Sequence, residues 1–390
     1  MSKKWTKINI PQFLRFCNQS FRLSDRARSL RDGRKAPRRK PQTIFFSVFL
    51  MGATAMKSIL QLDQNLRMDG VPSGLKVSDS TIQRVLKIFD IAPLRKLLHS
   101  SFLISRQMGH SSLKLGNRKL RVGLIDGSSF GKFLASAFQV IGQVNLMVDI
   151  KRIEKLGKEL PTSREIIKEL VEEFGKRFVD LILLDGLYAD KNTINLCKKE
   201  SNIDVLIKTE EETLDIIDHA KRIFSNEKMR AEIEYEEGFD PERWCKYKVF
   251  AVEGLHFEGV EFPMKVAMVE EYYPKRKRNK EVKFFVITTF EELSAMEMRE
   301  LGHLRWRIEN NGFRALNDQT NCKHVYTHDE NAFDALMMIL FTAWNLLNAY
   351  VESLDKEELR KVFGKVKFTL RFFSSLLLRS FGSEVIPEVT

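Results

Sequence analysis

Apolar residues recur at helical spacing through the first 115 residues and predict a helical region there. A continuous apolar block over residues 44–62 predicts one long helix. A second helix is predicted to begin at the capping residue Ser78 and to bury its apolar residues between Ile82 and Phe89. Two interpretations of this second helix stay open: a packing helix, or part of a helix-turn-helix.

From residue 120 onward, short apolar runs alternate with helical segments. The runs predict strands at residues 121–126, around 138–150, at 179–184 and at 203–207. The capping box Thr162-Ser163-Arg164-Glu165 marks the expected start of the helix between the second and third runs. This alternation predicts an α/β domain with a largely parallel sheet.

Residues 230–292 contain strand-like runs without intervening helices, so we predict a β-rich insertion there. Helical spacing returns after a second capping box, which runs from Ser294 to Glu297. The apolar stretch over residues 332–351 is interrupted by Asp334 and by two asparagines. We therefore expect a buried helix rather than a membrane span, followed by a basic amphipathic tail.

The excess positive charge is concentrated at the start of the chain. The 390 residues carry a formal net charge of +12, and 13 Lys and Arg against two Asp in residues 1–50 contribute +11 of it. Such a segment attracts polyanions, nucleic acid above all, although a solvated terminus has the same composition. A basic loop over residues 274–280 leaves the same two alternatives open. The candidate nucleic-acid contacts in the first segment are Arg34, Lys35, Arg38, Arg39 and Lys40.

The four cysteines are widely spaced and form no CxxC pair, which favours a reducing compartment over a disulfide scaffold. We expect a cytoplasmic protein associated with the nucleoid. Cys322, His324 and His328 are an alternative zinc site, but no second Cys pair accompanies them, and we interpret them as loop residues.

Three acidic residues carry the candidate chemistry. Asp126 and Asp185 each end an apolar strand-like run and precede a glycine, and Glu309 lies in a helical pattern. Taken singly, the aspartates fit turns and Glu309 fits a salt bridge to Arg305. Taken together, two carboxylates at strand ends and one on a crossing helix form a site for divalent metal. Asp149 and Asp190 are alternative members, although Asp149 lies within a strand and Asp190 fits a helix cap.

The acids stand in three blocks of distinct sequence. The first block ends in Asp126-Gly127, and the second reads Leu183-Leu184-Asp185-Gly186-Leu187-Tyr188-Ala189-Asp190. The third reads Arg305-Trp306-Arg307-Ile308-Glu309-Asn310-Asn311-Gly312-Phe313-Arg314. In this order they resemble bacterial and archaeal insertion-sequence transposases with a ribonuclease-H-like DDE domain and a β-rich insertion before the catalytic glutamate.

The resemblance implies that Asp126, Asp185 and Glu309 are a catalytic triad that binds Mg²⁺ or Mn²⁺, and that Arg305 contacts DNA. It also implies cleavage at element ends followed by strand transfer, with double-stranded DNA and a second copy of the chain as partners. We accordingly predict a basic helical DNA-binding region, a ribonuclease-H-like catalytic domain in two segments, the insertion and a helical tail. Their residues are 1–115, 120–229 with 293–350, 230–292 and 351–390.

Two positions depart from the pattern of that family. Gly302 stands where a Tyr is frequent, and Leu316 and Asn317 stand where a Lys is expected. Arg307, Arg314 and Lys323 are candidates to replace the missing phosphate contacts. The departures keep two alternative functions open: a catalytically inactive DNA-binding regulator, and a structure-specific nuclease on the same fold.

Overall fold

The computed structural model describes residues 8–68, 71, 75–155, 157–210, 213–274, 280–364 and 367–381, without the side chains of residues 227, 230, 231 and 306–313. Contacts divide the chain into two units. Unit 1 contains residues 1–111, 127–154 and 312–390, and unit 2 contains residues 112–126 and 155–311. The boundaries fall within one strand, β3 (Val122–Phe130), and within one helix, α10 (Ala295–Thr320).

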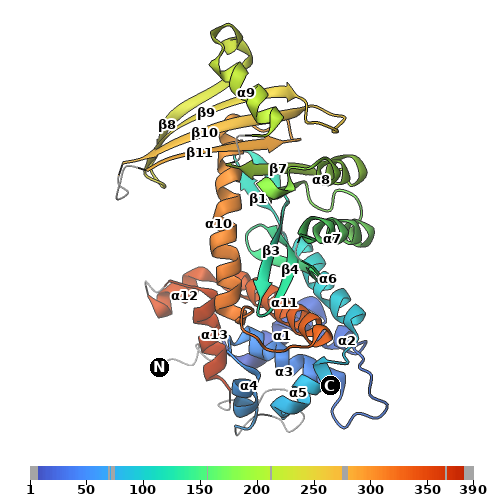
Figure 1. Ribbon diagram of the computed structural model, residues 1–390. Coiled ribbons are helices and arrows are strands. Elements are labelled where there is room, and N and C mark those ends of the chain that lie inside the picture. Colours follow the sequence, from blue (N-terminus) through green and yellow to red (C-terminus); the bar gives the residue numbers. More distant parts are fainter. Residues whose placement is uncertain are drawn as a thin grey trace. The chain divides into compact units, whose positions relative to one another are not determined.

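Unit 1 is mainly helical, and most of its elements are labelled in Figure 1. These elements are α1 (Ile10–Phe21), α2 (Leu23–Ala27), α3 (Pro41–Ala53), α4 (Ile59–Leu66), α5 (Asp79–Leu86), α6 (Ile91–Gln107), β4 (Phe133–Ile141), β5 (Asn145–Arg152), α11 (Glu330–Ser353), α12 (Lys356–Phe363) and α13 (Leu370–Arg379).

Helix α11 forms the core of unit 1, where α3, α6 and β5 pack around it. The side chain of Asn345 fixes this packing, because its Nδ2 donates to Ser101 Oγ on α6 at 2.8 Å and to the Met147 carbonyl on β5 at 2.7 Å. Helix α11 is long and apolar enough to cross a membrane, but 94% of its apolar window is buried inside the protein. The prediction of a buried helix is confirmed.

One long helix is predicted over residues 44–62, but the apolar block forms two helices, α3 and α4. Helix α3 ends at Ala53, and Ala55 has a left-handed φ of 56° that no helix continues through. Helix α4 then starts afresh, because the Ser58 side chain accepts a hydrogen bond from the Gln61 amide. Apolar periodicity alone does not reveal such a break, since both helices are buried. The predicted cap at Ser78 is confirmed at the start of α5.

Unit 2 is built from strands and the helices that connect them (Figure 1). Besides the first part of β3 and most of α10, it contains β1 (Leu113–Leu115), β2 (Arg118–Leu120), α7 (Glu159–Phe174), β6 (Leu181–Asp185), the 3₁₀ helix η3 (Gly186–Tyr188), α8 (Lys191–Asn195), the π-helical turn η4 (Leu196–Glu200), β7 (Asp204–Thr209), α9 (Asp215–Ser225), η5 (Glu227–Glu232), β8 (Glu234–Asp240), β9 (Cys245–Leu255), β10 (Met264–Tyr273) and β11 (Lys280–Thr288).

The main sheet of unit 2 is mixed, with the strand order β3-β6-β7-β11-β10-β9-β8. Strands β3, β6 and β7 are parallel, and α7 and α8 lie between them in the chain. From β7 onward every pairing is antiparallel. The prediction of a largely parallel sheet is therefore wrong. The four strands in residues 230–292 extend the parallel strands, because β11 pairs directly with β7.

The two capping boxes have different outcomes. The box from Ser294 to Glu297 is confirmed: the Ser294 amide donates to Glu297 Oε2 at 2.9 Å, and the Glu297 amide donates to Ser294 Oγ at 3.1 Å. The box at Thr162 is wrong, because α7 already begins at Glu159 and Thr162 donates its hydroxyl to the Lys158 carbonyl. Local sequence does not separate an N-cap from a similar motif one turn inside the helix.

Candidate active site at the ends of paired strands

Parallel pairing places the two aspartates at equivalent positions of neighbouring strands. Val122 pairs with Leu181 and Leu124 with Leu183, and the same offset brings Asp126 level with Asp185. In both strands the residues before the aspartate are buried, and the aspartate itself is partly exposed. The acids therefore emerge together where the apolar core ends. The prediction that Asp126 ends its strand is wrong, because β3 continues to Phe130.

A buried arginine from α10 lies between the two carboxylates. Arg305 Nη2 is 3.3 Å from Asp126 Oδ1 and 3.5 Å from Asp185 Oδ2. The Arg305 side chain is 2% exposed, whereas the side chain of Asp126 is 13% and that of Asp185 is 42% exposed. Two neighbouring carboxylates repel each other, so a cation between them stabilises the pair. The salt bridge to Arg305 that fits Glu309 taken singly is not tested, because the side chain of Glu309 lies outside the described residues.

Asp185 also has the turn role that its sequence context indicated. Its Oδ1 accepts a hydrogen bond from the Leu187 amide at 2.9 Å and so caps η3. Gly186 is required at this turn, because an added Cβ would lie 2.6 Å from Thr209 Oγ1. The other oxygen of Asp185 remains directed to Arg305. One carboxylate thus serves both the turn and the candidate site.

The two alternative aspartates have other partners. Asp190 caps α8 and accepts from the Asn192 and Thr193 amides, so the capping interpretation is confirmed. Asp149 is fully buried on β5 in unit 1, where Arg95 Nη1 lies 3.0 Å and His99 Nε2 3.1 Å from its Oδ2. An internal ion pair accounts for its burial.

Helix α10 runs without interruption through the third sequence block, so Glu309 lies in a helix as predicted. The side chains of Glu309 and Arg307 lie outside the described residues, whereas Arg314 is described and exposed. Within the described part of the chain, no group of three or more His, Cys, Asp or Glu residues is arranged to hold a metal ion. Cys322, His324 and His328, the zinc alternative, are all described and form no such group.

The pair Asp126 and Asp185 nevertheless fits a divalent cation by its chemistry. Mg²⁺ prefers hard oxygen ligands and is commonly held by one or two carboxylates together with water and substrate phosphate. The partial exposure of both side chains leaves room for such ligands. A third carboxylate on the same helix as Arg305 would complete the donor set.

The departures from the transposase pattern have structural reasons. At Gly302 an added Cβ would lie 3.0 Å from a ring carbon of Phe284 and 3.2 Å from a methyl carbon of Val286, so a larger residue would require these β11 side chains to shift. Leu316 is buried in unit 1, and Asn317 accepts a hydrogen bond from the Lys323 amide. These positions serve packing and turn formation.

Residues 158–346 match the family model of the transposase DDE domain. This segment of the chain is similar to a transposase DDE domain. The matched segment contains Asp185 and Glu309, whereas Asp126 precedes it. The mixed α/β fold with its large mixed sheet is consistent with a ribonuclease-H-like transposase domain. No curated protein matches the chain.

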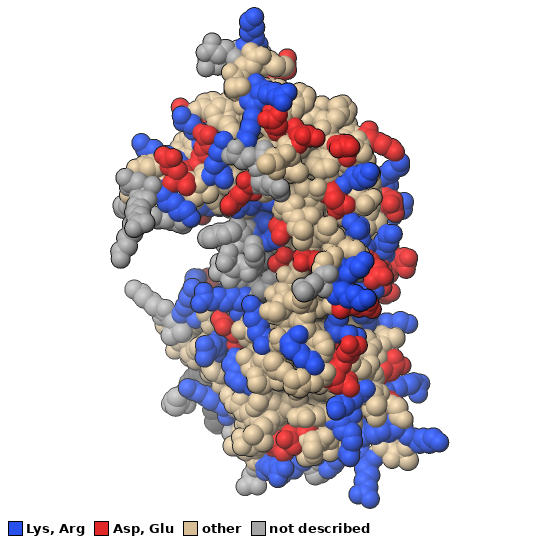
Figure 2. All heavy atoms as spheres, in the orientation of Figure 1, with Lys and Arg blue, Asp and Glu red and all other residues tan. Residues whose placement is uncertain are grey.

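The basic residues at the start of the chain precede the matched segment in the sequence. Lys35, Arg38 and Lys40 are exposed in the loop between α2 and α3, and Arg34 and Arg39 are half-buried. Figure 2 shows Lys and Arg side chains gathered over this loop. Arg34 pairs with Asp32 at 2.6 Å and is held inside the loop. The basic loop at 274–280 falls on residues 275–279, which lie outside the described residues.

Proposed function

We propose that the protein is a DNA transposase that cuts and joins DNA at the ends of its own insertion sequence with divalent metal. Asp126, Asp185 and Glu309 are the proposed catalytic and metal-binding residues. The observation that carries the proposal is the meeting of Asp126 and Asp185 at one guanidinium of α10, the helix to which Glu309 belongs. The transposase domain match supports the same function.

The three carboxylates would hold Mg²⁺ or Mn²⁺. When bound, such ions supply activation of the attacking oxygen and charge stabilisation of the leaving oxygen in phosphodiester cleavage. The carboxylates would hold the ions where the paired strands β3 and β6 become partly exposed, at a position open to a DNA backbone. When metal is bound by the carboxylates, the Arg305 guanidinium would be available to bind a phosphate oxygen.

The proposed reaction has two steps without a covalent enzyme intermediate. In the first, a water oxygen attacks phosphorus at the element end, the P–O3′ bond breaks, and a 3′-hydroxyl and a 5′-phosphate are released. In the second, this 3′-hydroxyl attacks a phosphodiester of target DNA, and the target's own 3′-oxygen leaves with a proton. The number of phosphodiester bonds is unchanged in the second step, so no external energy source is needed.

The partners follow from this function. Double-stranded DNA is the substrate, and the exposed basic residues of the loop between α2 and α3 are proposed to bind it together with Arg307 and Arg314. Two element ends have to be held at once, so we propose a homodimer in the synaptic complex. Such a protein acts in the cytoplasm at the nucleoid.

The test is strand cleavage and joining by the purified protein on DNA that carries its own element ends, with Mg²⁺ or Mn²⁺. Asp126→Asn and Asp185→Asn are expected to abolish both products, because each removes a carboxylate charge from the site. Asp218→Asn is the matched control, since Asp218 is an exposed acid of unit 2 that pairs with Arg222. It is expected to leave both products unchanged.

Each result decides between functions. Cleavage by Asp126→Asn at the rate of the unaltered protein would refute the assignment. DNA binding without nicking in either metal would identify an inactive regulator, and cut products without joined ones would identify a nuclease.

A further inference from the structure

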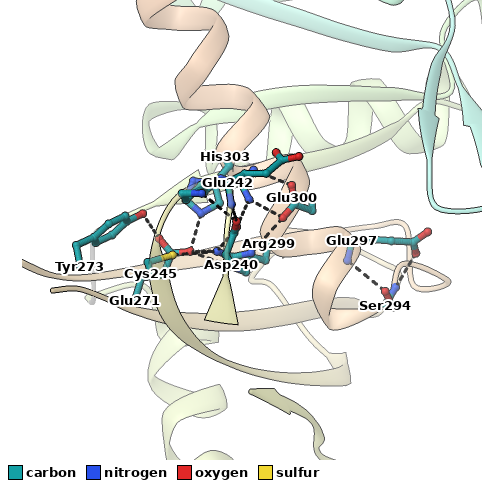
Figure 3. A network of polar contacts seen from close by, with 11 residues as sticks. Asp240, Glu242, Cys245, Glu271, Tyr273, Ser294, Glu297, Arg299, Glu300 and His303 are labelled. Carbon is teal, nitrogen blue, oxygen red and sulfur yellow. Dashed lines mark hydrogen bonds and ion pairs between the residues drawn. The ribbon is translucent and has the colours of Figure 1, made fainter. Parts of the chain in front are cut away.

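A buried network of charged side chains links α10 to strands β8 and β10 of the sheet in unit 2. Figure 3 shows Arg299 at its centre, among Glu271 and Tyr273 of β10, Asp240 of β8 and the neighbouring α10 residues. The Arg299 side chain is 1% exposed and that of Glu271 is fully buried. Arg299 Nη2 lies 2.6 Å from Glu271 Oε1 and 3.0 Å from Asp240 Oδ2.

The network reaches further along both elements. His303 Nε2 lies 2.7 Å from Glu271 Oε1, and the Tyr273 hydroxyl donates to Glu271 Oε2 at 2.6 Å. Arg243, in the turn between β8 and β9, forms two bonds to Glu300 of 2.8 and 2.7 Å. The bonds of His303 and Tyr273 and the charges of His303 and Arg299 outweigh the desolvation of Glu271 and lower its pKa to about 2.

Stability alone does not explain such a network. Burying an arginine and a carboxylate has a large desolvation cost, and well-packed apolar residues often stabilise the same position equally well or better. Ionic bonds differ from apolar packing in direction: a guanidinium with several fixed partners allows one orientation of its helix. The Phe284 and Val286 side chains meet α10 at Gly302, and at this contact the helix contributes no side chain of its own to set its rotation, unlike at the buried Met298 and Leu301.

The position of the network along α10 connects it to the site. Arg299 and His303 are one helical turn apart and bind the same carboxylate, which fixes both the rotation and the axial position of the helix. Arg305 follows six residues after Arg299, about 9 Å along the axis. A rotation by one residue, about 100°, would turn Arg305 away from Asp126 and Asp185.

We propose that Arg299, Glu271 and His303 are positioning residues of the transposase site, which hold α10 in the orientation that brings Arg305 and Glu309 to the two aspartates. The proposal rests on the function proposed above only for its catalytic consequence. The network acts on the site through α10, and strands β8 and β10 are its anchor.

The test compares two charge-neutral double variants of the full-length protein. Arg299→Met with Glu271→Gln removes the central pair at nearly constant volume. Arg121→Met with Asp180→Asn removes a matched pair, since Arg121 Nη2 lies 2.6 Å from Asp180 Oδ1 at the opposite end of β3 and β6. Each variant is examined by thermal melting, by hydrogen exchange of α10 peptides, and by kcat and KM for cleavage of element-end DNA.

The network variant is expected to exchange α10 amides faster and to lose kcat by about 100-fold with little change in KM, because a displacement of about 1 Å has that effect on rate. The control is expected to keep both α10 exchange and kcat. Unchanged exchange and kcat in a folded network variant would overturn the proposal, and so would the same losses in the control.

Two further arms keep the result decisive. Arg299→Lys retains the charge but loses the planar fork, and restoration of kcat by Lys would reduce the role to charge and overturn the proposal. The Arg299→Lys variant also tests the proposal if the double variant does not fold. If the unaltered protein does not cut DNA, the proposed function fails, and α10 exchange alone then decides whether the network positions the helix.

Discussion

At the scale of single residues, the candidate site is organised by one arginine and two aspartates. Sequence identifies the aspartates, because each ends a buried apolar run and precedes glycine. For Arg305, local spacing offers only Glu309, four residues away, as a partner within the chain. The fold brings Arg305 within 3.3 Å of Asp126, a residue 179 positions earlier in the chain.

Arg305 is expected to compete with metal for the same carboxylate oxygens in the absence of DNA. Arg305→Gln should therefore bind Mn²⁺ more tightly than the unaltered protein, by roughly fivefold if the ion pair contributes about 1 kcal/mol. Isothermal titration with Mn²⁺ alone measures this. Arg222→Gln, which removes an exposed arginine of α9, is the control and should leave the affinity unchanged. Weaker binding by Arg305→Gln would show that Arg305 supports the metal site rather than competing with it.

At the scale of elements, α10 is the part of the fold that joins the site to the rest of unit 2. Sequence predicts its start correctly, since the capping box at Ser294 is a local signal. Its partners are not predictable in the same way, because Glu271 and Asp240 come from strands earlier in the chain. One signal was present: Glu271 stands between the inward-facing residues Val269 and Tyr273 of β10 and is buried with them.

Gly302 is expected to be required by the close approach of α10 to β11. Alanine normally stabilises a helix interior by about 1 kcal/mol relative to glycine. Here Gly302→Ala should instead lower the melting temperature, because its Cβ would meet the buried Phe284 ring at 3.0 Å. Gly302→Tyr, which restores the residue frequent in related transposases, should lower it further. A higher melting temperature for Gly302→Ala would show that β11 yields at this point.

At the scale of the whole molecule, charge and function are distributed unequally along the chain. The basic segment lies in unit 1, whereas Asp126, Asp185 and Arg305 all lie in unit 2. The first described residue, Ile8, and the last, Phe381, both belong to unit 1. Unit 1 is assembled from three separate segments of the chain, and unit 2 from two.

Replacing Lys35, Arg38 and Lys40 together by Gln is expected to weaken DNA binding and to flatten its salt dependence. Each phosphate contact contributes about 0.9 to the slope of log K against log salt, so the slope should fall by roughly 2 to 3. Fluorescence anisotropy over a salt series measures it. The matched control is a triple variant of unit 2 with the same change in net charge, in which Lys168, Lys176 and Arg177 are replaced by Gln. An equal fall in both variants would indicate an effect of net charge alone.

The sequence by itself determined the local features of this protein: the helices and strands with strong periodicity, the caps at Ser78 and Ser294, the buried helix α11, and the two aspartates. These depend on residues close together in the chain. Tertiary structure decided the mixed pairing of the sheet, the break between α3 and α4, and the partners of Arg305 and Arg299. Those depend on which distant segments become neighbours, and the free energy of such contacts has no local signature in the sequence.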